Sequence, residues 1–293
     1  MKQQNDICPL GHSKSQFPRP GSVRDAPNVE LVECKECGIV SHSVDLTFSV
    51  NYAEGTMHER EKDNSEQLND PTSDVSRRVE QVRSVIEDKQ PGYVLDLGCG
   101  EGQMIEAFQK EGLSALGVEP GPARARALAR GLKVVDELDN ISTLGVEFSD
   151  LVAVTMFHVM EHIYSPLEFL KDLYSRMPAG SHLIIETPNS QDALLVKFEC
   201  EAFQNFTYWS HHPHLYSPKA LEQILSMAGF SHVRVEGAQR YGLANHLFWL
   251  SKARPGGHDA WAEMFSPELE LSYSRDLAEL GLSDTLMATC VKS

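Results

Sequence analysis

The sequence predicts an α/β fold built on a doubly wound parallel sheet with helices on both faces. Short apolar runs alternate with amphipathic helical segments from about residue 76 onward, and this alternation favours parallel strands joined by crossover helices. One apolar run, Tyr93–Leu97, breaks into three closely spaced glycines before a helical pattern begins. In such sheets, ligands bind beyond the carboxyl ends of the strands. We expect strands near 93–97, 114–118, 132–135, 150–154 and 182–186.

The first 48 residues form a separate zone, rich in proline, glycine and serine, that carries four metal-ligating side chains. Cys34 and Cys37 offer two thiolates on one turn, which is a common half of a tetrahedral zinc site. Cys8 and His12 can supply the other half. Four protein ligands leave no open position, so this zinc would be structural. The alternatives are a knuckle that has lost its metal and a Cys34–Cys37 disulfide, which a reducing compartment disfavours.

Residues 49–75 are polar and charged, and they indicate a linker or a mobile lid. A helix is expected from Val75 to Glu87, where valine and isoleucine recur at helical spacing. The globular core therefore begins at about residue 76.

The turn after the first apolar run reads D-x-G-x-G-x-G, beginning at Asp96. Glycines at this place let a ligand lie against bare backbone at the N-terminus of the next helix. The dinucleotide-binding pattern G-x-G-x-x-G fails because its last position is Gln103. A second apolar run, Leu113–Val118, ends in Glu119, and an acid at that place can hydrogen-bond a ribose diol. The alternatives are a nucleotide-dependent oxidoreductase and a turn that serves packing alone.

Later segments continue the alternation of strands and helices. Ser165-Pro166-Leu167-Glu168 has the form of a capping box with proline at the first helical position. Phe230–Glu236 and residues 281–292 are further candidate strands. Two longer stretches, near 190–217 and 237–265, interrupt the pattern and are expected to be insertions.

Composition restricts the partners of this protein. The 293 residues carry a formal net charge of −16, and the sequence has no basic patch that would follow phosphates, so nucleic acid is not an expected partner. Anionic membranes are excluded on the same ground, and no run approaches the ~20 apolar residues of a membrane helix. The N-terminus lacks the apolar stretch of a signal peptide, so a cytoplasmic location is expected, where six cysteines would stay reduced. The expected partner is a small molecule, and the oligomeric state is left open.

The glycine turn and the acid that follows it resemble motif I of class I S-adenosylmethionine-dependent methyltransferases. The segment His158-Val159-Met160-Glu161-His162 is similar to the His-Val-Leu-Glu-His signature that many members carry after the fourth strand. The resemblance covers roughly residues 76–293 and implies a Rossmann-like core with a seven-stranded sheet, whose seventh strand, 281–292, lies antiparallel between the fifth and the sixth. It further implies that S-adenosylmethionine contacts Asp96, Gly98, Cys99, Gly100, Gly102, Glu119, Phe157 and His158.

A narrower resemblance concerns the N-terminal zone and a histidine-rich segment. A zinc-knuckle-like module followed by this core is similar to bacterial sugar C-methyltransferases that act on nucleotide-linked deoxysugars. Those enzymes carry a Tyr-His-Glu-His-Leu-like motif, and this chain has His212-Pro213-His214-Leu215, with proline in place of the glutamate. The resemblance implies a small polar acceptor, such as a nucleotide-linked or polysaccharide-pathway sugar. The alternatives are an O-methyltransferase of another small natural product and a catalytically silent cofactor-binding scaffold.

Methyl transfer to a hydroxyl or a carbon acid requires removal of a proton, and an imidazole that titrates near neutrality suits that task. His214 is the first candidate for the base, because it matches the histidine-rich motif of the narrower resemblance. His158 is the second, from its place after the fourth strand, and His246 is the third. We expect the insertions near 190–217 and 237–265 to lie on the acceptor side of the site.

Overall fold

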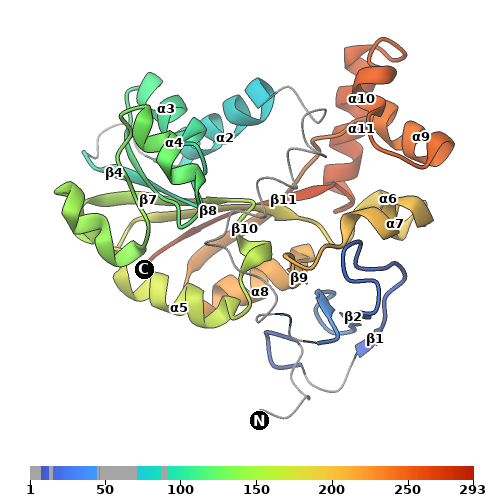
Figure 1. Ribbon diagram of the computed structural model, residues 1–293, viewed down its shortest axis with the longest axis horizontal. Coiled ribbons are helices and arrows are strands. Elements are labelled where there is room, and N and C mark those ends of the chain that lie inside the picture. Colours follow the sequence, from blue (N-terminus) through green and yellow to red (C-terminus); the bar gives the residue numbers. More distant parts are fainter. Residues whose placement is uncertain (1–7, 13–15, 45, 47–70, 87–90) are drawn as a thin grey trace.

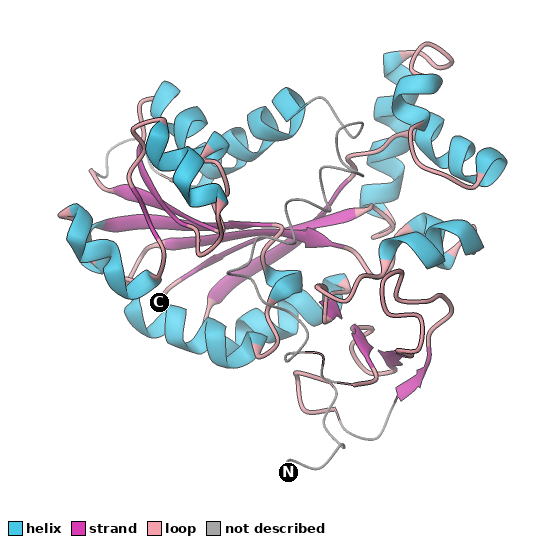
Figure 2. Cartoon of the chain, viewed as in Figure 1, coloured by secondary structure: helices cyan, strands magenta, loops and turns pink. Residues whose placement is uncertain are grey.

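The computed structural model describes residues 8–12, 16–44, 46, 71–86 and 91–293. Its main body is a seven-stranded sheet with helices on both faces (Figures 1 and 2), as the sequence predicts. The strand order is β10-β11-β8-β7-β4-β5-β6. Within the described ranges, no helix is long and apolar enough to cross a bilayer. The strands are β4 (Tyr93–Leu97), β5 (Ser114–Val118), β6 (Val134–Val135), β7 (Leu151–Phe157), β8 (His182–Pro188), β10 (Ser231–Ala238) and β11 (Thr285–Val291).

Strands β6, β5, β4, β7 and β8 pair in parallel, and β11 runs antiparallel between β8 and β10. This arrangement confirms the place predicted for the seventh strand. The predicted strands 93–97 and 114–118 coincide with β4 and β5. Of the predicted strand 132–135, only Val134 and Val135 pair with β5.

Both faces of the main sheet are buried, which explains its near-continuous apolar strands. Val94 of β4 packs in one core with Val82 and Phe108, whereas the next residue, Leu95, packs in the other core with Leu170. Figure 1 shows that helices cover both faces. The helices of the first face are α2 (Pro71–Val85), α3 (Gln103–Lys110) and α4 (Ala123–Ala129), and those of the second are α5 (Pro166–Arg176) and α8 (Pro218–Ala228).

Two predicted helix starts differ from the structure. Helix α2 begins at Pro71, so the last five residues of the predicted 49–75 linker are helical; residues 47–70 lie outside the described ranges. Pro166 occupies the first turn of α5 as predicted, but the capping box does not form, because Ser165 makes no side-chain cap bond. With ψ at 68°, Ser165 departs from the extended conformation that a capping side chain requires.

A second, four-stranded antiparallel sheet joins the N-terminal module to the core. Its fourth strand, β9 (His214–Leu215), comes from the predicted 190–217 insertion and pairs with β3, where Ser41 lies opposite His214. A hydrogen bond of 2.8 Å from Ser190 Oγ to the carbonyl of Gly38 reinforces the joint. Backbone and side-chain hydrogen bonds therefore connect the module directly to the core. Its strands are β1 (Gln16–Pro18), β2 (Leu31–Cys34) and β3 (Val40–His42).

The second predicted insertion forms a helical unit between β10 and β11, at the upper right of Figure 1. Glu270 accepts hydrogen bonds from the backbone N–H groups of Leu243 and Ala244, at 2.6 and 3.0 Å. A carboxylate at this helix N-terminus is favoured by the helix dipole. The predicted insertions contain α6 (Ala193–Val196), α7 (Glu201–Thr207), α9 (Leu243–Lys252) and α10 (Gly257–Ala260). The helical unit also includes α11 (Pro267–Glu279), which lies beyond the predicted end at 265. Short 3-10 helices lie at Leu138–Leu144, Phe148–Asp150 and Met160–His162.

Candidate active site

The glycine turn between β4 and α3 contains three residues with positive φ, of 70° at Gly98, 54° at Gly100 and 85° at Gly102. A Cβ atom added at Gly98 would lie 2.5 Å from Val159, and one at Gly102 would lie 2.2 Å from Leu132. A Cβ atom at Gly100 would meet nothing within 4 Å. Two of the glycines are thus required by packing, while Gly100 borders open space at the carboxyl end of β4.

Glu119 follows β5 and is buried beside this turn. Its Oε2 accepts a hydrogen bond from the backbone N–H of Gly100 at 2.9 Å, and its Oε1 accepts one from Gly121 at 2.7 Å. The carboxylate is therefore fixed at the edge of the turn, next to the open side of Gly100. The sequence predicts an acid at this place for a ribose diol.

Asp96 lies at the end of β4 and is buried. Its Oδ1 accepts a hydrogen bond from the hydroxyl of Thr155 at 2.7 Å. Burial raises the pKa of Asp96 to about 7, and the nearby Glu119 carboxylate acts in the same direction against the Thr155 hydrogen bond. Near neutral pH, the Asp96 carboxyl is therefore only partly ionised.

Two further residues predicted to contact the cofactor are Cys99, in the glycine turn, and Phe157, at the end of β7. The Cys99 side chain points into the core, because a Cβ atom at Gly117 would lie 2.4 Å from its Sγ. Only the backbone of Cys99 is thus available to a ligand, and burial raises the pKa of its thiol. Phe157 ends β7, and the Arg78 guanidinium lies over its ring at 5.0 Å from the centroid.

His158 follows Phe157 in a left-handed conformation, with φ at 57°. Its Nδ1 lies 3.1 Å from Glu161 Oε1, and its Nε2 lies 3.1 Å from Arg240 Nη1 and 3.4 Å from Glu186 Oε1. Burial and Arg240 lower the pKa of His158, but the two carboxylates outweigh them, so that the pKa is raised overall. A positive φ in a non-glycine residue is uncommon and directs the imidazole into this group of charges.

Sequence reasoning missed the ion pairs around Glu186. This carboxylate is fully buried in β8 and accepts hydrogen bonds from Arg77 and Arg78 of α2, at 3.0 Å each. Although burial opposes it, hydrogen bonds from His158 and Arg78 hold the pKa of Glu186 well below its ordinary value. The sequence does contain a signal for these ion pairs, which is a glutamate inside an apolar strand. A buried charge requires partners of opposite charge.

A cavity of about 240 Å³ lies beside His158, between the carboxyl end of β8 and the two insertions. It is lined by aromatic, polar and charged side chains, and the segments 190–217 and 237–265 supply most of them. The N-terminal module supplies Arg24, whose guanidinium lies 4.6 Å from the ring centroid of Trp209. Among the lining residues are Arg24, His158, Asn189, Phe203, Phe206, His212, Arg240, Tyr241, Asn245, His246, Trp249 and Asp284.

The three histidines predicted as candidate bases are not brought together. His158 and His246 line the cavity. His214 lies in β9 instead, with Nδ1 2.8 Å from the Ser41 hydroxyl and Nε2 3.3 Å from the carbonyl of Tyr164. Its neighbour His212 lines the cavity in its place. Both ring nitrogens of His214 are thus engaged at the joint between the module and the core.

His246 is buried against the helical unit. Its Nδ1 lies 2.8 Å from the Tyr273 hydroxyl, and its Nε2 lies 3.3 Å from the Gln239 amide. Burial lowers the pKa of His246 to about 4. At neutral pH this imidazole is uncharged.

The structure brings the four predicted metal ligands of the module together. His12 Nδ1 lies 3.6 Å from the sulfurs of both Cys8 and Cys34, and the sulfurs of Cys8 and Cys37 lie 3.7 Å apart. A tetrahedral zinc with Zn–S bonds of ~2.3 Å requires sulfurs about 3.8 Å apart. All six cysteines of the chain are free thiols, so the alternative of a Cys34–Cys37 disulfide is not found.

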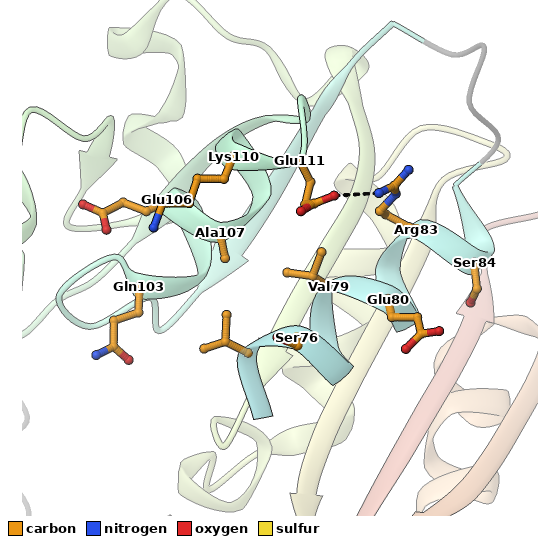
Figure 3. Close-up of a pocket in the computed structure, with 11 residues that line it drawn as sticks. Ser76, Val79, Glu80, Arg83, Ser84, Gln103, Glu106, Ala107, Lys110 and Glu111 are labelled. Atoms are coloured by element: carbon orange, nitrogen blue, oxygen red, sulfur yellow. Dashed lines mark hydrogen bonds and ion pairs between the residues drawn. The ribbon is translucent and has the colours of Figure 1, made fainter. Parts of the chain in front are cut away.

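A larger groove, of about 800 Å³, runs between α2 and α3 (Figure 3). Figure 3 shows Arg83 and Glu111 paired across one end, at 2.6 Å, and Gln103 at the other. The groove is made by the surfaces of two helices and receives no residue from a strand end. Its polar side chains belong to helix surfaces, whereas the smaller cavity beside His158 lies at the carboxyl ends of strands.

Comparison with known proteins agrees with this geometry. A family model described as a methyltransferase domain matches residues 71–235, which is more than half of the chain. The ubiquinone biosynthesis O-methyltransferase of Vibrio vulnificus is 30% identical over 102 residues, covering 33% of this chain and 43% of that enzyme. The enzyme of the same name from Acinetobacter baumannii is 28% identical over 104 residues, covering 33% and 44%. The chain thus spans less than half the length of these curated relatives.

Solved structures of methyltransferases share the fold. A SAM-dependent methyltransferase from Archaeoglobus fulgidus superimposes with a TM-score of 0.51 at 23% identity, covering 74% of this chain and 93% of that one. The plantazolicin methyltransferase BpumL superimposes with a TM-score of 0.51 at 17% identity, covering 82% and 92%. At these identities the likeness concerns the Rossmann-like core and leaves the acceptor open.

Proposed function

Since this chain belongs to the methyltransferase-domain family, we propose that it transfers a methyl group from S-adenosylmethionine to a small polar acceptor. The observation that carries this proposal is the placement of two features at one edge of the sheet. A bare glycine turn with its acid, Glu119, lies at the ends of β4 and β5, and a polar, aromatic-lined cavity lies at the end of β8.

The residues at the first feature fit the cofactor. Gly100 borders open space where a ligand can approach the backbone, and the Glu119 carboxylate beside it can accept hydrogen bonds from a ribose diol. When bound, S-adenosylmethionine supplies a methyl group made electrophilic by its sulfonium. The chain's own contribution is then to hold the acceptor in line with that methyl group and to remove a proton.

The cavity beside His158 receives the acceptor in this proposal. Its volume of about 240 Å³ suits a small molecule, and polar side chains such as His212, Arg240 and Tyr241 are part of its lining. The first candidate is a nucleotide-linked or polysaccharide-pathway sugar, which rests on the resemblance of the N-terminal zone. The second is a ring-bearing natural product methylated on oxygen, which the aromatic wall of Phe203, Phe206 and Trp249 supports.

We assign the proton-accepting role to His158. It lines the cavity, and its pKa is raised by Glu161 and Glu186, which makes the neutral imidazole a stronger base. His246 is the second candidate, and its lowered pKa makes it a weaker base. His214, the first candidate from the sequence, is placed at the joint of the module and serves here as the comparison variant.

We further propose that Cys8, His12, Cys34 and Cys37 hold one structural zinc ion. The spacing of their donor atoms supports this assignment, and four protein ligands leave no position for a substrate. Elemental analysis of protein purified without added metal should find about one zinc per chain. The six free cysteines suit a reducing compartment, and we place the protein in the cytoplasm.

The function is tested by incubating the protein with S-adenosylmethionine and a small-molecule extract of its source cells. Formation of S-adenosylhomocysteine, together with a metabolite that gains one methyl group, is the expected result. The Glu119→Ala protein, with its weakened cofactor site, serves as the control. Tight cofactor binding with no product in any extract fraction would support the alternative of a silent scaffold.

A further inference from the structure

A second group of metal-ligating side chains lies between the turn after β7 and the loop before β9. It consists of Glu161, His162 and His212, and one donor atom of each lies within 4.8 Å of the others. We propose that these residues bind a divalent cation at the wall of the acceptor cavity, and that the cation holds two adjacent oxygens of the acceptor. The second part rests on the proposed methyltransferase function, whereas the first stands without it.

The ring of His162 is held by a hydrogen bond to the backbone. Its Nδ1 lies 2.9 Å from the backbone carbonyl of His211, to which it donates a hydrogen bond. This bond places the ring proton on Nδ1 and the lone pair on Nε2. Metal-ligating histidines are held in this way by an outer acceptor, which fixes the tautomer and the plane of the ring.

Glu161 is held equally firmly. It is buried, its Oε2 accepts a hydrogen bond from the Thr187 hydroxyl at 3.0 Å, and its Oε1 lies 3.1 Å from Nδ1 of His158. A carboxylate has about four lone-pair positions, so two remain for a cation. The same carboxylate would thus contact both the cation and the proposed base.

The third ligand is positioned by the N-terminal module. The His212 side chain lines the cavity, and its backbone N–H donates to the carbonyl of Trp209 at 2.9 Å. Asp25 of the module holds the same turn by accepting hydrogen bonds from Ser210, at 2.9 Å from the backbone N–H and 2.6 Å from the hydroxyl. The cavity wall therefore gains a metal ligand only when the module is docked.

The donor set determines the chemistry. Two imidazoles and one carboxylate leave coordination positions open, in contrast to the closed Cys₃His group of the module. An acceptor with two vicinal hydroxyls, or with a hydroxyl beside a carbonyl, can fill two of them. A bound cation lowers the pKa of such a hydroxyl. His158 would take up the hydroxyl proton, and the acceptor oxygen would then gain the methyl group, its O–CH₃ bond forming as the S–CH₃ bond of the cofactor breaks to give neutral S-adenosylhomocysteine.

The metal site is tested with Mn²⁺ on the full-length protein, whose Cys₃His group is first saturated with zinc. Free Mn²⁺ is followed by electron paramagnetic resonance without cofactor or acceptor. One Mn²⁺ should bind per chain. Loss of an outer partner costs 10–100-fold in metal affinity, so His212→Ala and His162→Ala should each lose affinity by at least about that factor. The matched control, His211→Ala, keeps the backbone carbonyl that orients His162 and should bind as the wild type does.

Glu161→Gln provides a variant of the same shape that retains the Thr187 hydrogen bond. It should also lose Mn²⁺ affinity while keeping one zinc per chain and the wild-type melting temperature. Absence of Mn²⁺ binding to the wild-type protein would overturn the proposal, as would equal affinity in the His212→Ala and His211→Ala proteins. Calorimetry with S-adenosylmethionine on the same samples tests the proposed function separately, because the proposed cofactor site does not include Glu161, His162 or His212.

Discussion

Two parts of the carboxyl edge of the main sheet, the proposed cofactor site (the cofactor edge) and the proposed acceptor site (the acceptor edge), are built in different ways. At the cofactor edge, the glycine turn and Glu119 come from one continuous stretch, residues 93–121. At the acceptor edge, the cavity wall combines the N-terminal module, the turn after β7 and both insertions. In the proposed function, cofactor binding therefore depends on local sequence, whereas acceptor binding depends on the assembly of distant segments. The two functions should be separable by mutation.

The largest separation is expected from loss of the zinc site. In the Cys34→Ser, Cys37→Ser double variant, the binding free energy of a structural zinc, about 10–16 kcal/mol, is no longer available to the module. The turn that carries His212 and the position of Arg24 should be lost with it. Product formation should fall to background, while affinity for S-adenosylmethionine stays nearly unchanged. Calorimetry measures the affinity for S-adenosylmethionine, and an S-adenosylhomocysteine assay measures product formation. If the variant lost both cofactor affinity and product formation, the two functions would not be separable.

The next effect concerns the base. His158→Ala should lower the single-turnover rate by ~10²–10⁴-fold, because no other imidazole at the cavity has a raised pKa. His214→Ala should leave this rate close to the wild-type value and cost about 1–3 kcal/mol of stability, since Ser41 and Tyr164 lose a buried partner. Rapid quench measures the rates and chemical denaturation the stabilities. A His214→Ala enzyme with the greater loss of rate would restore the first candidate from the sequence.

The pH dependence of the wild-type rate gives an independent reading of the same assignment. Without a divalent cation at Glu161, the pKa of His158 is raised above its ordinary value of 6.5 by Glu161 and Glu186, so the rate is measured in buffer without added Mn²⁺ or Mg²⁺. A protonated imidazole cannot accept a proton, so the rate should fall as pH is lowered through this raised pKa. Replacement of the base should abolish that titration. A profile with no inflection above pH 6.5 would point to a different group.

A smaller effect is expected at Glu119. Glu119→Ala removes a charged acceptor of the ribose diol, worth ~1.5–3 kcal/mol, and should weaken binding of S-adenosylmethionine accordingly. Glu137→Ala, at an exposed acid after the next strand, is the matched control and should bind normally. Isothermal titration calorimetry provides both affinities. Equal affinity in the two variants would remove Glu119 from the cofactor site.

The smallest effect distinguishes two glycines of the turn. Alanine at either position carries a left-handed strain of about 1–2 kcal/mol. Gly98→Ala should lose additional stability, because its Cβ would lie 2.5 Å from Val159. Gly100→Ala has no such contact and should instead lose affinity for S-adenosylmethionine. Thermal melting with and without the cofactor compares the two, and a larger melting shift on cofactor addition in Gly100→Ala than in Gly98→Ala would contradict this assignment.

Sequence reasoning was most successful where the signal is local. Strands β4 and β5, the turn between them and Glu119 all follow from apolar runs, glycine spacing and one acid. The antiparallel place of β11 followed from the family resemblance alone. The valine spacing predicts helix α2. It does not predict the ion pairs of Arg77 and Arg78 in this helix, because their partner Glu186 lies 108 positions from Arg78.

The acceptor edge was harder to predict for a physical reason. Strand β9 has only two residues, too few for a hydrophobic period, and its pairing with β3 is decided by tertiary contacts. Two histidines separated by one residue would share a face in an extended strand. Here His212 lies in the turn before β9 and His214 within it, so only His212 reaches the cavity. His214, the first candidate base from the sequence, lies instead at the joint between the module and the core.

The pairing of β3 with β9 also bears on how the protein is made. Ser41 and His214, which hydrogen-bond across this joint, are 173 positions apart. The N-terminal strands therefore leave the ribosome long before the strand that completes their sheet. During this interval β3 has an unpaired edge, which is a template for aggregation. If the module bound zinc soon after its synthesis, it would be ordered before β9 is made and pairs with β3. Zinc shortage in growing cells should then show first in newly made chains, as aggregates.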